Sequence, residues 1–131
     1  MEDSFNVYGK PLRACCMNPV TGFFRNGCCD TSNEDVGMHT VCVIVTQAFL
    51  EFSKSRGNDL STPLLEYNFP GLKEGDKWCL CAKRWLEAYE NKVAPKVVIS
   101  ATHIKTLEVI DIQTLEKFAV DTDLFKNDKL L

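Results

Sequence analysis

Seven cysteines and two histidines are the residues of this sequence best suited to chemistry. Thiolate and imidazole groups bind zinc, and a thiolate beside an imidazole acts as a nucleophile. We therefore expect some of these groups, drawn from distant segments, to share one place in the fold. They are Cys15, Cys16, Cys28, Cys29, Cys42, Cys79, Cys81, His39 and His103.

A metal site is the first hypothesis, because the sequence holds more than the four soft ligands that tetrahedral zinc requires. The spacing of Cys79 and Cys81 argues against a metal site that uses both. In one regular strand Cys79 and Cys81 would hold their β-carbons about 7 Å apart, whereas sulfurs on one zinc ion lie about 3.8 Å apart. The alternative is that buried thiols fill space as small apolar side chains. The candidate ligands, for zinc if any ion binds, are Cys28, Cys29, His39, Cys79 and Cys81.

A thiol-dependent enzyme is the second hypothesis. Cys81 directly precedes a predicted helix with Arg84 in its first turn, and both a helix N-terminus and a cation stabilise a thiolate. His39 or His103 is the candidate base, because each lies at the end of a predicted strand. Such a histidine more often bonds to nearby backbone, so whether the protein is an enzyme stays open. The carboxylates that could orient the imidazole are Asp30, Glu34 and Asp35.

A ligand pocket or protein-binding surface without catalysis is the third hypothesis. The aromatic residues exceed what a few short helices and strands need, although plain core packing under long loops would also use them. Phe23 and Phe24 make the loop of residues 13–38 a candidate surface for an adaptor that binds another protein. The candidate ligand-binding residues are Arg84, Trp78 and Asp35.

The composition of the chain narrows the classes of partner that we expect. Fifteen Lys and Arg against 18 Asp and Glu give a net charge of −3, so no bulk attraction to nucleic acid or anionic lipid exists. The longest apolar run, residues 41–45, is far too short to cross a bilayer, and the acidic start lacks a signal peptide's apolar stretch. We expect no nucleic-acid or membrane partner, a cytoplasmic location and, in that reducing compartment, free thiols. A small-molecule or protein partner stays unidentified.

Two strand and helix units are predicted to position these residues. The β-branched run at 39–45 predicts an interior strand, followed by a helix from 47 with Thr46 as its N-cap. Residues 77–81 predict a second strand that leads into a helix from 82. Strands at 96–102 and 106–110 then precede a last helix from 112.

The remaining segments are predicted as loops. Residues 1–38 are rich in loop and turn residues, with Asn26-Gly27 predicting a small hairpin, and residues 57–76 form a long connection. The charged tail, 121–131, is expected to fray. Residues 1–131 thus predict a single two-layer α+β domain. About three helices cover one face of a small mixed sheet, and the loops of 13–38 and 57–76 cover an edge or the other face.

Several runs together resemble the family called domain of unknown function 2237. The resemblance covers residues 6–120 and implies a single-domain, soluble α+β protein found widely in bacteria. It implies no activity, cofactor or catalytic residue. The runs include Pro-Val-Thr-Gly-Phe-Phe-Arg (19–25), Phe-Pro-Gly-Leu-Lys (69–73), Gly-Asp-Lys-Trp-Cys-Leu-Cys-Ala (75–82) and Ala-Thr-His (101–103).

Overall fold

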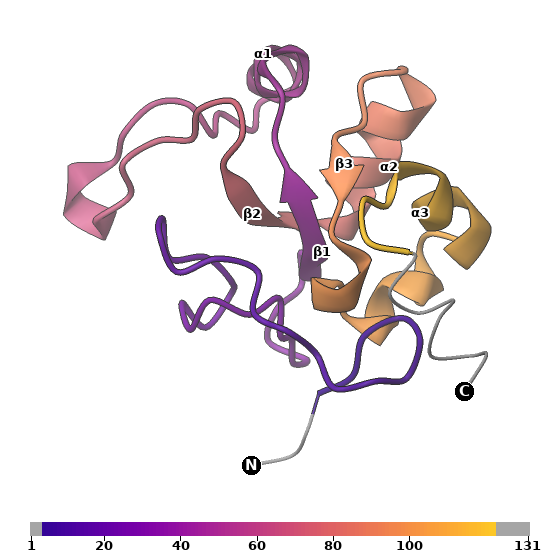
Figure 1. Cartoon of the computed structure of the whole chain (residues 1–131). Coiled ribbons are helices and arrows are strands. Elements are labelled where there is room, and N and C mark those ends of the chain that lie inside the picture. Colours follow the sequence, from indigo (N-terminus) through magenta and orange to yellow (C-terminus); the bar gives the residue numbers. More distant parts are fainter. Residues whose placement is uncertain (1–3, 123–131) are drawn as a thin grey trace.

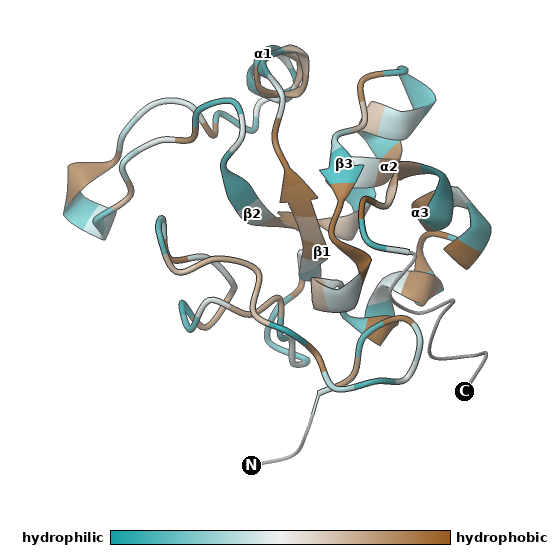
Figure 2. Cartoon of the chain, viewed as in Figure 1, coloured by the Kyte–Doolittle hydropathy of each residue, from teal (hydrophilic) through white to brown (hydrophobic). Residues whose placement is uncertain are grey.

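The central strand β1 (His39–Ile44) forms where β-branched residues are densest, and its four inner residues are buried. The computed structural model describes residues 4–122. It places β1 between β2 (Lys77–Cys81) and β3 (Lys96–Val97), and both pairings are antiparallel (Figure 1). Colouring by hydropathy shows most of β1 as hydrophobic (Figure 2). The predicted α+β class is confirmed, although the strand pairing is antiparallel rather than mixed.

Three helices begin where the sequence predicts them. α1 (Gln47–Ser55) starts after Thr46, whose hydroxyl accepts a hydrogen bond from the Phe49 backbone N–H. α2 (Ala82–Glu90) continues directly from β2, and α3 (Ile112–Phe118) packs near β3. No helix among residues 4–122 is long and apolar enough to span a membrane.

The larger apolar core lies on the helix side of the sheet and centres on Trp85. This side chain is fully buried, and its indole N–H donates to the Pro95 carbonyl at 3.1 Å. Its ring stacks on Tyr89 and meets Phe118 edge-on, with ring centroids 5.7 and 5.4 Å apart. Side chains alternate along β1, so Val41 joins this core while Cys42 faces the other side of the sheet.

The N-terminal segment, residues 4–38, covers that second face, and disulfides attach it to the sheet. Cys15 is bonded to Cys42 of β1, and Cys29 is bonded to Cys79 of β2. The prediction of free thiols is wrong for these four residues, because the fold brings their sulfurs within bonding distance. It holds for Cys16, Cys28 and Cys81.

The predicted strands at 96–102 and 106–110 are mostly 3₁₀ helix instead. After the two residues of β3, the chain forms η2 (Ile99–Ala101) and η3 (Ile104–Glu108). The Asp121 carboxylate accepts the backbone N–H groups of Ile99 and Ser100 at 2.7 and 3.1 Å. These donors therefore do not need a neighbouring strand. The rest of the predicted tail, from residue 123, lies outside the described residues.

The predicted hairpin at Asn26-Gly27 is also wrong. The Gly27 carbonyl accepts the backbone N–H groups of Cys15 and Cys16, and the Gly27 N–H donates to Thr21. These bonds fold the segment back on itself without a two-stranded ribbon. In the long loop after α1, the 3₁₀ turn η1 (Leu65–Tyr67) is the regular element.

Candidate functional site

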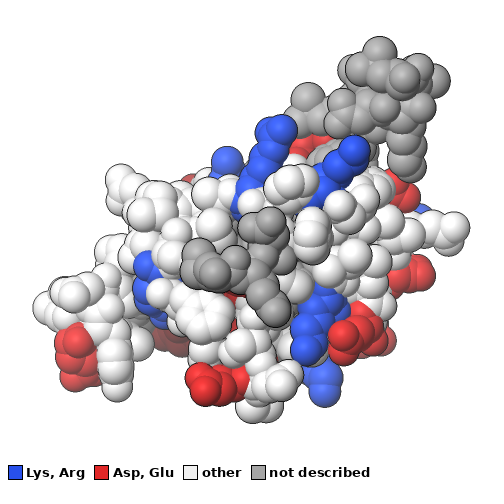
Figure 3. All heavy atoms as spheres, turned by 90° about the horizontal axis from the view of Figure 1, so that it is seen from below, with Lys and Arg blue, Asp and Glu red and all other residues white. Residues whose placement is uncertain are grey.

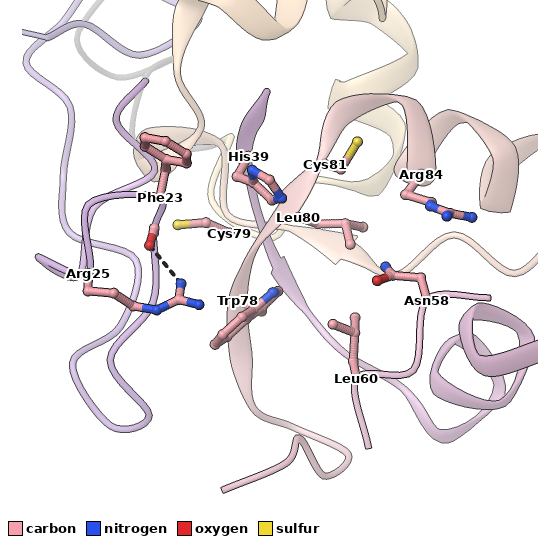
Figure 4. A pocket seen from close by; sticks show the side chains of 11 residues that line it. Phe23, Arg25, His39, Asn58, Leu60, Trp78, Cys79, Leu80, Cys81 and Arg84 are labelled. Atoms are coloured by element: carbon pink, nitrogen blue, oxygen red, sulfur yellow. Dashed lines mark hydrogen bonds between the residues drawn. The ribbon is translucent and has the colours of Figure 1, made fainter. Parts of the chain in front are cut away.

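A cavity of about 500 Å³ opens between β2, the start of α2 and two loops. This volume is typical of small-molecule sites. Figure 4 places Arg25 and Phe23 on one side, Arg84 and Asn58 on the other, and His39 and Cys81 at one end. Its lining residues are Gly22, Phe23, Arg25, His39, Asn58, Leu60, Trp78, Cys79, Leu80, Cys81 and Arg84.

His39 is held in a fixed orientation at the edge of the cavity. Its Nδ1 lies 2.6 Å from Oδ1 of Asp35, a carboxylate whose side chain is fully buried. Oδ2 of the same carboxylate accepts the His39 backbone N–H at 2.9 Å and the Thr31 hydroxyl at 3.0 Å. In the neutral ring, a proton on Nδ1 that is donated to this carboxylate leaves Nε2 as the acceptor.

Close packing also shapes the position of the imidazole. A β-carbon on Gly37 would lie 2.7 Å from Cε1 of His39, so a larger residue would displace the ring. The Phe23 ring lies nearly parallel to it, with centroids 6.4 Å apart. The ring is therefore positioned by Asp35, Gly37 and Phe23 while 42% of its side chain stays exposed.

Cys81 lies opposite His39 in the β1 and β2 register. It is a free, partly exposed thiol and occupies the N-cap position of α2. The pairing brings the backbones of a potential nucleophile and a potential base close together on one cavity. The structure thus places the predicted residues Cys81 and His39 side by side, although they are 42 positions apart in the sequence.

Two arginines face the cavity from opposite sides. The Arg25 guanidinium lies 5.2 Å from the centroid of the Trp78 ring and donates to the Gly22 carbonyl at 2.7 Å. Arg84 donates to the Arg56 carbonyl at 3.1 Å and lies 3.4 Å from the Glu87 carboxylate. A cation–π contact and a backbone bond thus hold Arg25, whereas a backbone bond and an ion pair with Glu87 hold Arg84.

The second predicted base, His103, is not among the cavity-lining residues. Its Nδ1 accepts the Lys105 backbone N–H at 3.0 Å, which caps η3. Burial lowers the pKa of its imidazole, and the charge of Lys105 lowers it further, whereas Asp30 opposes the change. His103 thus has a local structural role, and Asp30, which bonds to Ser4 at 2.6 Å, lies beside it rather than beside His39.

The predicted metal ligands are divided between two places. Cys81 and His39 line the cavity, whereas Cys29 and Cys79 belong to a buried sulfur cluster whose third member is Cys15. His39, Cys79 and Cys81 thus line one cavity, and this cavity adjoins the buried cluster at Cys79.

Cys28, the remaining predicted ligand, is a partly exposed free thiol. Burial raises the pKa of this thiol, and the nearby Asp30 carboxylate adds to the rise. Cys28 therefore loses its thiol proton less readily than an unperturbed cysteine does.

Sequence reasoning missed several residues that matter to these two places. The position of Cys42 on the second face of the sheet could have been predicted, because it alternates with the inward-facing valines of β1. The position of Cys15 could not have been predicted, since nothing in its spacing indicates which strand it contacts. Among the cavity-lining residues, Gly22, Leu60 and Leu80 carry no sequence signal of a site.

The surface leaves the partner predictions open. Phe23 and Phe24 are 38% and 46% exposed and contact each other edge-on, so the adaptor hypothesis stays a prediction. On the face that Figure 3 shows, acidic and basic side chains are interspersed among uncharged residues. The expected absence of nucleic-acid binding likewise stays a prediction.

Comparison with known proteins places the chain in a family without supplying a reaction. No curated protein matches the sequence. A family model described as "Uncharacterized protein conserved in bacteria (DUF2237)" matches residues 5–119. This match confirms the resemblance predicted from the sequence runs, and the chain belongs to the DUF2237 family.

Proposed function

We propose that the protein binds a small organic anion with a flat apolar part in the cavity beside β2. The observation that carries this proposal is the charge of the lining. Two arginines and one imidazole face the cavity, and none of the described residues that line it is acidic. The chain as a whole is acidic, so a lining with two guanidinium groups and no carboxylate among its described residues favours an anionic ligand, with Arg25 as the main cation because Glu87 lies 3.4 Å from Arg84.

The other lining residues support a ligand with an apolar part. Trp78 and Leu60, which are 7% and 9% exposed, form an apolar wall next to the arginines. Guanidinium groups recognise carboxylate and phosphate oxygens through paired hydrogen bonds. A ring stacked on the wall with its acidic group between Arg25 and Arg84 would use both kinds of contact.

Calorimetric titration with phenyl phosphate, benzoate and benzylamine tests the proposal. The two anions should bind with a Kd below about 1 mM, and benzylamine, a cation of similar shape, should not bind. Arg25→Gln and Arg84→Gln should each weaken anion binding by about tenfold or more, because each removes a charged hydrogen-bond donor.

Arg13→Gln is the matched control, since Arg13 is exposed and does not line the cavity. It changes the net charge by the same amount and should leave binding unchanged. Equal binding of benzylamine, or an equal loss in the Arg13 variant, would remove the basis of the proposal.

We propose thiol-dependent catalysis as the second candidate function. It is favoured by Cys81 lying opposite His39, whose other ring nitrogen is held by buried Asp35. A nucleophile, a base and a group that orients the base are the parts of a Cys-His-Asp arrangement. In such an arrangement Nε2 of His39 would take the proton of the Cys81 thiol.

Iodoacetamide labelling at pH 7 under non-reducing conditions, read by peptide mass spectrometry, tests this candidate. Cys81 should react about tenfold faster than the free thiols Cys16 and Cys28, because its register partner His39 can accept the thiol proton during the attack. His39→Gln should abolish the difference. His103→Asn, which keeps a side-chain acceptor at the cap of η3, should preserve it. Uniform labelling of the three thiols would argue against a catalytic Cys81.

A further inference from the structure

Four buried cysteines meet on the sheet face that the N-terminal segment covers. Cys42 and Cys79 are register partners on β1 and β2, while Cys15 and Cys29 approach from the segment. The sulfurs of Cys15, Cys29 and Cys79 lie within 4.8 Å of one another, and Cys42 is bonded to Cys15. All four residues are less than 7% exposed. We name Cys15, Cys29, Cys42 and Cys79 the sulfur cluster.

Three sulfurs of the cluster already lie close together, and the fourth is bonded to one of them, which is a starting arrangement for a tetrahedral thiolate site. Opposite residues on neighbouring antiparallel strands hold their β-carbons about 4.5 to 5.5 Å apart. This is closer than two cysteines on the same strand, and it suits the spacing of about 3.8 Å between sulfurs on one zinc ion. The sulfurs of Cys15, Cys29 and Cys79 meet the 4.8 Å limit, and the sulfur of Cys42, which is bonded to Cys15, would approach the other two by side-chain rotation once that bond opens.

We propose that the reduced protein binds one zinc ion through Cys15, Cys29, Cys42 and Cys79. Two ligands come from the sheet and two from the N-terminal segment. The ion would therefore attach the segment at the same four points as the two disulfides. This site adjoins the anion cavity at Cys79, and its test, metal binding by the reduced chain, does not depend on what binds in the cavity.

Backbone contacts keep the sheet ligands in place when the disulfides open. The Cys79 N–H donates to the Thr21 hydroxyl at 2.8 Å, and the Cys42 N–H donates to the Thr102 hydroxyl at 3.2 Å. The Cys15 N–H donates to the Gly27 carbonyl at 2.7 Å. None of these bonds involves sulfur, so reduction leaves three of the four ligand backbones tied to their neighbours.

The chemistry balances with a dithiol as the reductant. Two dithiol molecules supply four electrons and four protons, and each becomes its own disulfide. The two S–S bonds of the sulfur cluster break and give four thiols. Zinc then forms four Zn–S bonds, and up to four protons pass to water as the thiols become thiolates.

Metal titration of the full chain tests the proposal. The protein is reduced with a dithiol, freed of it by anaerobic gel filtration and titrated with Co²⁺ and then Zn²⁺. One Co²⁺ per chain should bind with the visible and charge-transfer bands of a tetrahedral thiolate site, and one Zn²⁺ should displace it. Binding of less than about half an equivalent of Co²⁺, or binding by the oxidised chain, would overturn the proposal.

Serine variants identify the ligands. Each of Cys15→Ser, Cys29→Ser, Cys42→Ser and Cys79→Ser should weaken metal binding by more than about tenfold. Cys16→Ser and Cys28→Ser are matched controls, because they change free thiols adjacent to Cys15 and Cys29. They should bind as the unmodified chain does, and an equal loss in these controls would overturn the ligand assignment.

X-ray absorption of the zinc-loaded chain covers the case in which a variant does not fold. It should show four sulfur neighbours at about 2.3 Å. A shell that contains nitrogen would overturn the assignment, because it would implicate a histidine rather than the sulfur cluster alone.

Discussion

Replacing Cys29 and Cys79 together by alanine is expected to lower the free energy of unfolding of the oxidised protein by about 4 kcal/mol. The disulfide closes a loop of 50 residues, and the open unfolded chain has correspondingly more conformations. Urea unfolding without reductant or metal measures the change.

The second disulfide closes a shorter loop, because Cys15 and Cys42 are 27 residues apart. By the same chain-entropy relation, replacing Cys15 and Cys42 together by alanine should lower the free energy of unfolding by about 3.5 kcal/mol.

The loss should also appear as a melting temperature lowered by about 15 °C, given the unfolding entropy expected for a chain of this length. The double variant Cys16→Ser with Cys28→Ser is the control, since neither thiol is bonded. It should change the free energy of unfolding by no more than about 0.5 kcal/mol. A disulfide variant that loses less than about 1 kcal/mol would show that the bond does not constrain the unfolded chain.

Trp85→Ala is expected to lower the free energy of unfolding by about 4 kcal/mol. The side chain is fully buried between Tyr89 and Phe118. Its removal leaves a large cavity and an unpaired Pro95 carbonyl. Denaturant unfolding, monitored by far-ultraviolet circular dichroism, measures the change.

Tyr67→Ala is the matched control, because Tyr67 is an aromatic residue with 73% of its surface exposed. Its loss should stay within about 0.5 kcal/mol. Similar losses in the two variants would mean that burial of Trp85 does not determine stability.

The parts of the fold that could be predicted from sequence are those with local signals. β1 is predictable because its β-branched residues are buried on both faces, and α1 because Thr46 supplies a side-chain cap. η2 was not predictable in this way. The run of Val97, Val98 and Ile99 favours a strand, but the partner of its backbone donors is the carboxylate of Asp121, 22 residues away.

The candidate site likewise has residues that could be predicted from the sequence and residues that could not. Residue type and place in the predicted elements singled out Cys81, His39 and Arg84, and residue type singled out Trp78; the cavity brings these four together. The disulfide pairing was beyond sequence reasoning, because adjacent cysteines such as Cys15 and Cys16 look equivalent along the chain. Only the fold of the N-terminal segment turns one member of each pair toward the sheet.

The attachment of the N-terminal segment has a consequence for protein engineering. Gly22, Phe23 and Arg25 line one side of the cavity and lie between Cys15 and Cys29, the two points where disulfides join the segment to the sheet. Between these points Phe23 and Phe24 are exposed and can be exchanged, whereas Thr21 must stay, because its buried hydroxyl accepts the Cys79 N–H of β2. Loop grafting between the two anchors can therefore redesign ligand selectivity while the scaffold stays constant.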